Sequence, residues 1–460
     1  MSDLDAVLAR IDADLDASLD RLSTLLRIPS VSTEAAHVAD CRKAAEWLVA
    51  DLASIGFDAS LRDTDGHPMV VAHDRAASGP SALFYGHYDV QPVDPLELWD
   101  HAPFEPVVET RADGSKMIRA RGASDDKGQL MTFVEACRAW KAVTGALPAP
   151  VTIFLEGEEE AGGESMGPFL EANGEELKAD IALVCDTNMW NAATPAITYS
   201  LRGLVGGELV LRAADRDLHS GYYGSAARNP IALLASILAD LRDAEGRVTL
   251  PGFYDGVPET PAEIKAMWDG LGFDESAFLG EIGLSVPAGE QGRSVLEQTW
   301  ARPTAEINGI IGGYTGDGFK TVIPAEASAK ISFRLVGDQD PDAVWASFEA
   351  FVRERLPADC EAEIKAPHGA RAISLPLDSP SLRAAAQALT EEWGAPAAII
   401  GGGGSIPVVG EFKRRLGMDT LLVGFALETD NIHSPNEKYE LKSFHKGVRS
   451  WARILAALAD

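Results

Sequence analysis

The sequence has few cysteines, comparatively few basic residues and no long apolar run, and each shortage excludes a class of protein. Its four cysteines lie far apart among 460 residues and form no C-x-x-C pair, so neither a disulfide framework nor a thiolate zinc site is indicated. Forty Lys and Arg residues stand against seventy Asp and Glu residues, which gives a net charge of -30. A field of that sign repels nucleic acids and anionic membranes. We therefore expect neither as a partner.

The same shortages predict a cytoplasmic protein. No stretch of the chain approaches the roughly 18 apolar residues that a membrane span requires. The N-terminus, Met1 to Asp5, is acidic where a secretory signal would be basic. The composition, 46% hydrophobic and 24% charged, is typical of globular proteins, and the length allows two or three domains.

The first part of the chain has the pattern of an α/β domain. Short apolar runs at 82–85, 151–155 and 181–185 each end in polar residues, which predicts buried strands. Apolar residues at helical spacing over 4–26 and 130–140 predict helices between and around them. Alternation of this kind indicates a largely parallel central sheet, and sites in such sheets lie beyond the carboxyl ends of the strands.

The middle of the chain predicts a second domain of a different class. Its strands and helices are expected in the order β-α-β-β-α-β, at 198–211, 229–241, 304–312, 326–336, 341–356 and 360–366. This order is that of the α+β ferredoxin-like unit, here with an insertion at about 250–299 that is too long for an ordinary connection. From about residue 375 the first pattern returns. We therefore predict a discontinuous α/β domain (1–198 and 375–460) interrupted by an α+β domain (199–374).

Five polar clusters lie where the α/β pattern places an active site. They are His87-Tyr88-Asp89, Asp125-Asp126-Lys127-Gly128, Glu158-Glu159-Glu160, Cys185-Asp186 and Asn431-Ile432-His433-Ser434. Each cluster alone is compatible with an ordinary surface loop, since a lone loop histidine or a run of glutamates is usually solvated. Together they supply two histidines and several carboxylates, a ligand set suited to zinc, with manganese or cobalt as substitutes.

The clusters can hold a pair of divalent ions. If two ions lie about 3.5–4 Å apart, a carboxylate should bridge them, and Asp125 is the natural candidate. Asp126 is its neighbour, although the spacing to Lys127-Gly128 favours the first aspartate. Each ion then needs one histidine and one further carboxylate, which the sequence can supply as His87 with Asp186 and His433 with Glu160.

Two further carboxylates have predicted roles beside the ligands. A metal-bound histidine generally gives its other ring N–H to a carboxylate, and Asp89 lies two residues from His87. Glu159 remains free to act as a general base that takes a proton from water. Glu158 precedes it in the same run, which leaves an ambiguity of one position in the base.

The order and spacing of these motifs resemble the co-catalytic dizinc peptidase family of aminoacylase, carboxypeptidase G, succinyl-diaminopimelate desuccinylase and the cytosolic nonspecific dipeptidase. The motifs are H-Y-D, G-A-S-D-D-K-G, E-G-E-E-E-A-G-G-E, C-D and H-S-P-N-E. The resemblance implies a zinc-binding catalytic domain interrupted by a lid and dimerisation domain. It also implies the ligands, bridge, base and orienting aspartate named above.

Further segments resemble the dipeptidase branch. The segment 216–224 is similar to one whose histidine, here His219, reaches the partner's active site in family dimers and stabilises the oxyanion. Thr321 and Arg334 lie in segments that resemble those gripping a substrate's terminal carboxylate. A guanidinium suits that task because it can donate two parallel hydrogen bonds. Three more residues resemble substrate-side positions: His368, Gly404 and Ser405.

We therefore predict a homodimeric dizinc metallopeptidase that cleaves dipeptides or short peptides with a free C-terminal carboxylate, by a metal-activated bridging water and a glutamate base. An N-acyl amino acid amidohydrolase of the deacetylase or desuccinylase type is the alternative, because the same carboxylate grip would serve either substrate. A non-catalytic metal-binding scaffold is a remote alternative, since it would have no use for Glu159 as an unligated base. A glycosidase with paired carboxylates would leave His87, His433 and His219 unexplained.

Overall fold

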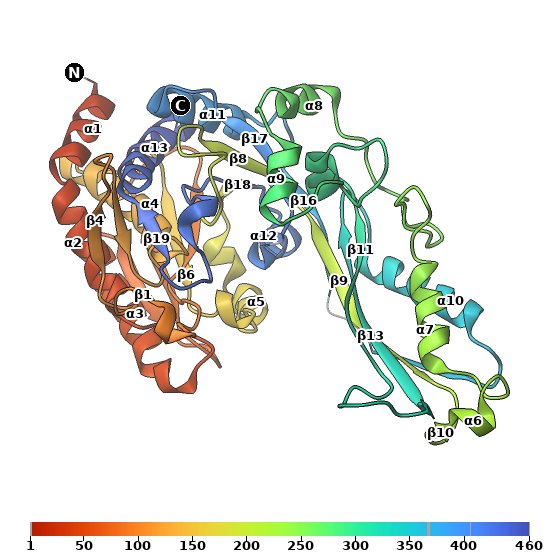
Figure 1. Cartoon of the computed structure of the whole chain (residues 1–460). Coiled ribbons are helices and arrows are strands. Elements are labelled where there is room, and N and C mark those ends of the chain that lie inside the picture. Colours follow the sequence, from red (N-terminus) through yellow and green to blue (C-terminus); the bar gives the residue numbers. More distant parts are fainter. Residues whose placement is uncertain (1, 366–368, 405, 460) are drawn as a thin grey trace. The chain divides into compact units, whose positions relative to one another are not determined.

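The computed structural model describes residues 2–365, 369–404 and 406–459. The chain forms two compact units (Figure 1). The first unit contains Met1–Tyr199, Leu375–Ile400 and Glu411–Asp460, and the second contains Ser200–Ser374 and Gly401–Gly410. Within the described residues, no helix combines the length and the apolar character needed to cross a membrane.

Most of the regular elements belong to the first unit. Its helices are α1 (Asp3–Ala13), α2 (Leu15–Leu26), α3 (Val38–Ser54), α4 (Lys127–Thr144), α5 (Met166–Leu177), α11 (Pro380–Trp393) and α13 (Leu441–Ala459). Its strands are β1 (Asp58–Arg62), β2 (Met69–Asp74), β3 (Ala82–His87), β4 (Val107–Thr110), β5 (Lys116–Arg119), β6 (Val151–Glu156), β7 (Ile181–Val184), β18 (Thr420–Leu422) and β19 (Lys438–Glu440). Two strands and one helix cross the boundaries between the units: β8 (Ala196–Leu201), β17 (Ala398–Gly402) and α12 (Pro407–Glu411). Short helical turns complete the unit: η1 (Ala35–His37), η2 (Leu96–Leu98), η3 (Glu159–Ala161), η5 (Phe412–Leu416) and η6 (Glu428–Asp430).

The central sheet of the first unit has the strand order β1-β2-β6-β3-β7-β18-β8. Its middle strands, β6, β3, β7 and β18, run parallel, whereas β1, β2 and β8 pair antiparallel with their neighbours. Every residue of β3, β6 and β7 is buried, as expected for parallel strands covered on both faces. The carboxyl ends of these strands meet at one edge of the sheet, and the predicted α/β class is confirmed.

Aromatic packing holds the helices of this unit to the sheet. The rings of Phe84 on β3 and Phe133 on α4 stack with centroids 3.9 Å apart, and Trp451 on α13 meets Phe133 edge-on at 5.4 Å. Helices α4 and α13 pack against each other. Helix α4 ends at Gly145, whose left-handed backbone (φ 80°) suits a residue without a Cβ. The helix that bears the G-A-S-D-D-K-G motif at its start is therefore fixed against the sheet.

Two boundaries differ from the sequence prediction. The single helix predicted over 4–26 is two helices separated at Asp14, whose carboxylate accepts a hydrogen bond from Arg10. The apolar spacing continues across this turn, so periodicity could not reveal it. The strand predicted over 421–425 is the shorter β18, because the chain leaves the sheet after Leu422.

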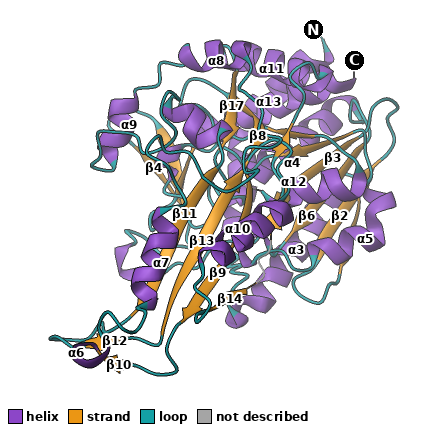
Figure 2. Ribbon diagram, turned by 90° about the vertical axis from the view of Figure 1, so that its right-hand side faces the viewer, coloured by secondary structure: helices purple, strands orange, loops and turns teal. Residues whose placement is uncertain are grey.

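The second unit is built on an antiparallel sheet of order β11-β13-β9-β14, drawn as long ribbons in Figure 2. Its elements are β9 (Gly203–Arg212), β10 (Leu218–His219), α6 (Ser220–Tyr223), α7 (Pro230–Ala239), α8 (Ala262–Asp269), α9 (Glu275–Glu281), η4 (Glu297–Ala301), β11 (Thr304–Gly312), β12 (Val322–Ile323), β13 (Glu326–Leu335), α10 (Pro341–Arg355), β14 (Glu361–Lys365), β15 (Gly369–Ala370) and β16 (Ile373–Ser374). Apolar side chains of α7 and α10 pack with the sheet in one core around Phe333 and Phe348. Asp340 caps α10 by accepting the backbone N–H groups of residues 342 and 343. The order β9-α7-β11-β13-α10-β14 confirms the predicted α+β class.

Candidate active site

The polar clusters of the first unit lie at the carboxyl ends of its parallel strands. His87 is the last residue of β3, Glu160 lies in η3 just after β6, and Asp186 follows β7 by two residues. Asp125 comes two residues before α4, and His433 lies between η6 and β19. Because parallel strands end at one edge of the sheet, residues far apart in sequence meet here.

Asp125 stands between the two histidines. Its Oδ1 lies 3.1 Å from His87 Nε2 and its Oδ2 lies 3.0 Å from His433 Nε2. His433 Nε2 is also 3.3 Å from Glu160 Oε1. Two groups of potential metal ligands result, His87 with Asp125 and Asp186, and Asp125 with Glu160 and His433, and in each the ligand atoms lie within 4.8 Å of one another. Asp125 is the one residue that both groups share.

The loop that presents Asp125 is tightly packed. A Cβ on Gly128 would lie 1.9 Å from the carbonyl oxygen of Ala123, so the first turn of α4 can approach this loop only with a glycine there. Lys127 is fully buried, and its ammonium donates to the carbonyl of Leu25 in the last turn of α2 and to that of Ile28 just beyond it. The K-G part of the motif is thus explained by packing around Asp125.

The charge balance of the site favours bound cations. Five carboxylates, those of Asp89, Asp125, Glu159, Glu160 and Asp186, accompany the two histidines. For the side chains by themselves, burial and the charge of Asp125 raise the pKa of Asp186 well above its usual range. Hydrogen bonds that His433 donates to Asp125 and Glu160 raise the pKa of its imidazole to about 10. Two divalent cations would offset this excess of negative charge, and imidazole nitrogen with carboxylate oxygen is a ligand set that zinc accepts. The residues fit a pair of divalent metal ions.

Hydrogen bonds distinguish neighbouring acids that the sequence left ambiguous. Glu158 is buried, and its two oxygens accept the backbone N–H groups of His67 and Ser165. The Glu158 carboxylate therefore shapes its own loop. Among the described residues, no backbone N–H donates to the Glu159 carboxylate, whose ionisation is affected by burial and neighbouring charges. Asp126 accepts the backbone N–H of His87 and lies outside both ligand groups.

Asp89 does more than the sequence suggested. It is fully buried with Oδ1 3.4 Å from His87 Nδ1. The same carboxylate accepts the backbone N–H of Glu160 at 3.0 Å and that of Glu159 at 3.3 Å. One side chain thus contacts both a candidate ligand and the turn that carries the candidate base.

Gln91 was missed by sequence reasoning. Its Nε2 donates to Glu160 Oε2 at 2.6 Å, which fixes the orientation of that carboxylate. The only sequence signal is its position in the loop after β3, two residues beyond Asp89. A lone glutamine in a loop carries too little pattern to be recognised.

The candidate residues of the second unit do not all lie together. His219 ends β10, which pairs with β12 directly after Thr321. His219 is exposed, and its Nδ1 accepts the backbone N–H of Gly221. Arg334 lies near the far end of β13, which starts at Glu326. At about 3.3 Å per residue, Glu326 and Arg334 are about 25–30 Å apart along β13. His219 and Thr321 lie near the Glu326 end, so they are distant from Arg334 within one copy of the unit. Gly404 lies in the described part of this unit with open space beside it, whereas His368 and Ser405 lie outside the described residues.

Paired ligand groups that share one carboxylate, at the strand ends of an α/β sheet, are the arrangement that a hydrolase of the two-metal type requires. Residues 83–457 match the model of Peptidase family M20/M25/M40, and the chain belongs to this family. The predicted family is thereby confirmed, and with it the dependence on divalent metal.

Curated relatives and solved structures match most or all of this chain. The Cys-Gly metallodipeptidase dug1 of Schizosaccharomyces pombe is 29% identical over 474 residues, covering 99% of this chain and 98% of the relative. The Beta-Ala-His dipeptidase of Homo sapiens is 28% identical over 386 residues, covering 83% and 75%. The solved structure of the dipeptidase Dug1p from Saccharomyces cerevisiae has a TM-score of 0.78 at 27% identity, covering 100% and 99% of the two chains. That of the M20 family metallo-carboxypeptidase Sso-CP2 from Sulfolobus solfataricus has a TM-score of 0.80 at 30% identity, covering 96% and 99%.

Proposed function

We propose that this protein is a dipeptidase that uses two divalent metal ions, zinc by preference with manganese or cobalt as substitutes, to hydrolyse dipeptides with a free C-terminal carboxylate. The observation that carries the proposal is the convergence of His87 and His433 on the two oxygens of Asp125. Relatives named as a metallodipeptidase and a dipeptidase support the substrate class.

The proposed roles of the first unit follow its geometry. His87 with Asp186 would hold one ion, His433 with Glu160 the other, and Asp125 both. Bound divalent ions polarise a carbonyl and lower the pKa of water. Glu159 would take the proton of the attacking water on its carboxylate and pass it to the leaving nitrogen. Burial raises the pKa of Glu159, with a contribution from Glu160, which brings a carboxylate base closer to neutral pH.

We propose the second unit as a lid and dimerisation unit, with the protein a homodimer. Strand β11 lies at the edge of the described sheet order, and Ile307, Ile310 and Ile311 are exposed on it. An edge strand with exposed apolar side chains favours pairing with another chain. The distance of His219 and Thr321 from Arg334 along β13 supports a site that draws the first two from the partner subunit, with Arg334 gripping the substrate carboxylate.

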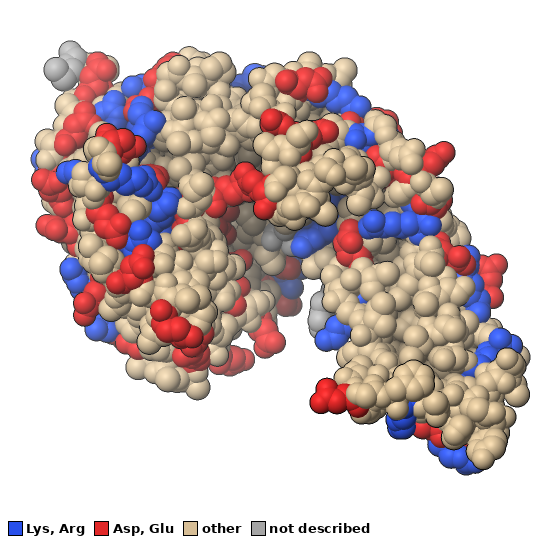
Figure 3. Space-filling view, in the orientation of Figure 1, with Lys and Arg blue, Asp and Glu red and all other residues tan. Residues whose placement is uncertain are grey.

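We also propose a cytoplasmic location, with a dipeptide or N-acyl amino acid as the substrate and a second copy of the chain as the partner. The four cysteines are unpaired and buried, which is typical of a reducing compartment. Acidic side chains are spread over the face shown in Figure 3, in keeping with the net charge of -30.

The substrate class is tested with protein reconstituted in zinc or manganese. A free dipeptide and the N-acetyl derivative of its C-terminal residue are offered in parallel, and the released amino acid is measured. Faster release from the dipeptide is expected. Faster release from the acetylated compound would instead assign the protein to the N-acyl amino acid amidohydrolases, with the same metal ligands.

The base is tested with Glu159→Gln, which keeps the shape of the side chain. We expect turnover to fall by about 10²–10⁴-fold with both ions still bound. Retained turnover would refute the assigned base. Loss of metal together with turnover would mean that Glu159 is a ligand.

The role of the dimer is tested with Ile311→Lys, which places a charge on β11. A monomer with little activity is expected, as judged by sedimentation and turnover. A monomer with full activity would exclude any contribution of the partner's His219.

A further inference from the structure

Two buried carboxylates outside both ligand groups connect the loops that carry Asp125 and His433. Glu437 follows His433 by four residues and Asp430 precedes it by three. Both acids have no exposed surface. Burying a charged carboxylate costs several kcal/mol unless donors surround it, so the contacts of these two side chains indicate what they organise.

Glu437 fills the concave side of the loop before α4. Its Oε1 accepts the backbone N–H of Ser124 at 2.9 Å and that of Asp125 at 3.0 Å, while Oε2 accepts the backbone N–H of Gly122 at 2.9 Å. Arg121, itself buried, donates to Oε2 at 2.8 Å. The backbone of the shared ligand Asp125 is therefore fixed by a side chain from the loop of His433.

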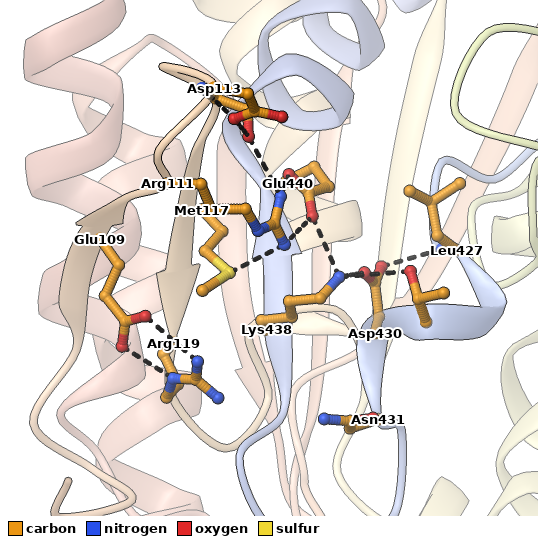
Figure 4. A network of polar contacts seen from close by, with 12 residues as sticks. Glu109, Arg111, Asp113, Met117, Arg119, Leu427, Asp430, Asn431, Lys438 and Glu440 are labelled. Atoms are coloured by element: carbon orange, nitrogen blue, oxygen red, sulfur yellow. Dashed lines mark hydrogen bonds and ion pairs between the residues drawn. The ribbon is translucent and has the colours of Figure 1, made fainter. Parts of the chain in front are cut away.

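Asp430 makes the reciprocal connection. Its Oδ2 accepts the Ser124 hydroxyl at 3.1 Å and the backbone N–H of Leu427 at 2.8 Å. Its Oδ1 accepts the ammonium of Lys438 at 2.6 Å. Figure 4 shows Lys438 reaching from β19 between Asp430 and Glu440. The start of the His433 loop is thus tied both to the residue before Asp125 and to the small sheet of β4, β5 and β19.

The two carboxylates act on different parts of the ligand set. Glu437 holds Asp125, which belongs to both ligand groups. Asp430 holds the turn leading to His433, which belongs to one group. If the two acids only stabilised the fold, their removal would not affect the two metal sites differently. If they position ligands, removal of Asp430 should affect one site and removal of Glu437 both.

We propose that Glu437 and Asp430 are positioning residues that set metal affinity, Glu437 for both ions and Asp430 selectively for the ion held by Glu160 and His433. The inference rests on the metal site of the proposed function. Partners outside the ligand set commonly change metal affinity by about 10–100-fold when mutated.

The test measures Zn²⁺ affinity by competition with a chromophoric chelator, and zinc content after dialysis, for Glu437→Gln and Asp430→Asn. Both variants keep side-chain shape and remove one charge. We expect Glu437→Gln to lower the affinity for both Zn²⁺ ions by about 10–100-fold. Asp430→Asn should lower the affinity to that extent only for the ion held by Glu160 and His433. Excess Zn²⁺ should restore turnover in both.

Matched controls remove the same charge from buried acids elsewhere in the unit. Glu392 is buried and accepts Arg449 and Arg453, and Asp74 is buried and accepts Lys141 and the backbone N–H of Ala76. Glu392→Gln and Asp74→Asn should lose stability but keep the Zn²⁺ affinity of the wild type. Equal loss of affinity in these controls would overturn the proposal.

Ligand variants separate this inference from the metal site on which it rests. If His433→Ala retains both ions, the metal site itself is wrong. If His433→Ala loses an ion while Glu437→Gln and Asp430→Asn bind Zn²⁺ as tightly as the controls, only the positioning role is overturned.

A milder variant covers the case in which the charge variants do not fold. Ser124→Ala deletes one hydroxyl that donates to Asp430. It should lower the Zn²⁺ affinity of one of the two sites by about 3–10-fold, which corresponds to the free energy of a single hydrogen bond. Unchanged affinity of both ions in this variant would refute the role of Asp430.

Discussion

Replacing Asp89 by asparagine should lower both the free energy of unfolding and the affinity for metal. The buried carboxylate accepts the backbone N–H groups of Glu159 and Glu160 and lies 3.4 Å from His87 Nδ1. Asparagine offers one oxygen, so its NH₂ group must face one of these donors. A hydrogen bond to a charged group contributes about 1.5–3 kcal/mol, and a buried donor left without an acceptor costs about 1–3 kcal/mol. These overlapping terms give an expected loss of about 2–4 kcal/mol in the free energy of unfolding.

Two quantities are measured for the variant and the wild type: the free energy of unfolding in urea after treatment with a chelator, and the Zn²⁺ affinity of the folded protein. Zn²⁺ affinity should fall by about 10–100-fold, because the charged carboxylate beside His87 Nδ1 is lost, while the backbone carbonyl of residue 89 stays 3.2 Å from that nitrogen. Asp74→Asn serves as a control, since Asp74 is also a buried acid with a backbone N–H partner. The reasoning is refuted if Asp89→Asn binds Zn²⁺ like the wild type, or if Asp74→Asn loses as much affinity.

Three further predictions concern the same unit. Gly157→Ala would place a Cβ 2.4 Å from the Tyr88 ring, and the overpacking should cost about 1–3 kcal/mol in urea unfolding; wild-type stability would contradict the close contact. Phe133→Ala should cost about 3–5 kcal/mol, measured in the same way, and a loss below about 1 kcal/mol would contradict the aromatic core. Burial opposes ionisation of Glu392, but hydrogen bonds from Arg449 and Arg453 outweigh it and lower its pKa. Its stabilisation is therefore present above the usual glutamate pKa and is lost as pH falls through the lowered one. The stability difference between wild type and Glu392→Gln should shrink between neutral and acidic pH, and a constant difference would refute this assignment.

Local patterns explain why much of the candidate site could be predicted. His87 and Asp186 follow short, fully buried apolar runs, and such runs are visible in the sequence as strands. Once the strands are assigned as parallel, the polar residues after them must meet at one edge. The same reasoning could not decide between Glu158 and Glu159, because that choice depends on which carboxylate meets the backbone of His67 and Ser165.

The split of the first predicted helix at Asp14 has a different cause. Buried residues Leu8 and Ile11 of α1 and Leu22 of α2 keep one apolar spacing through the turn. Periodicity reports which face is buried, and that face does not change at Asp14. Only the hydrogen-bond pattern of the backbone marks the end of α1.

The residues that sequence reasoning missed are those whose partners lie far away along the chain. Glu437 and Asp125 are separated by 312 positions, and Asp430 and Ser124 by 306. An isolated buried acid has no periodicity, and local contacts such as those of Asp430 with Leu427 and Lys438 do not reveal a distant partner. The ligands themselves are constrained by chemistry to histidine and carboxylate, which makes them recognisable. The surroundings that hold them at the required distances can be built from many residue types, because any donor or acceptor of suitable reach will serve. The affinity of the site for metal therefore depends on contacts that only the three-dimensional structure reveals.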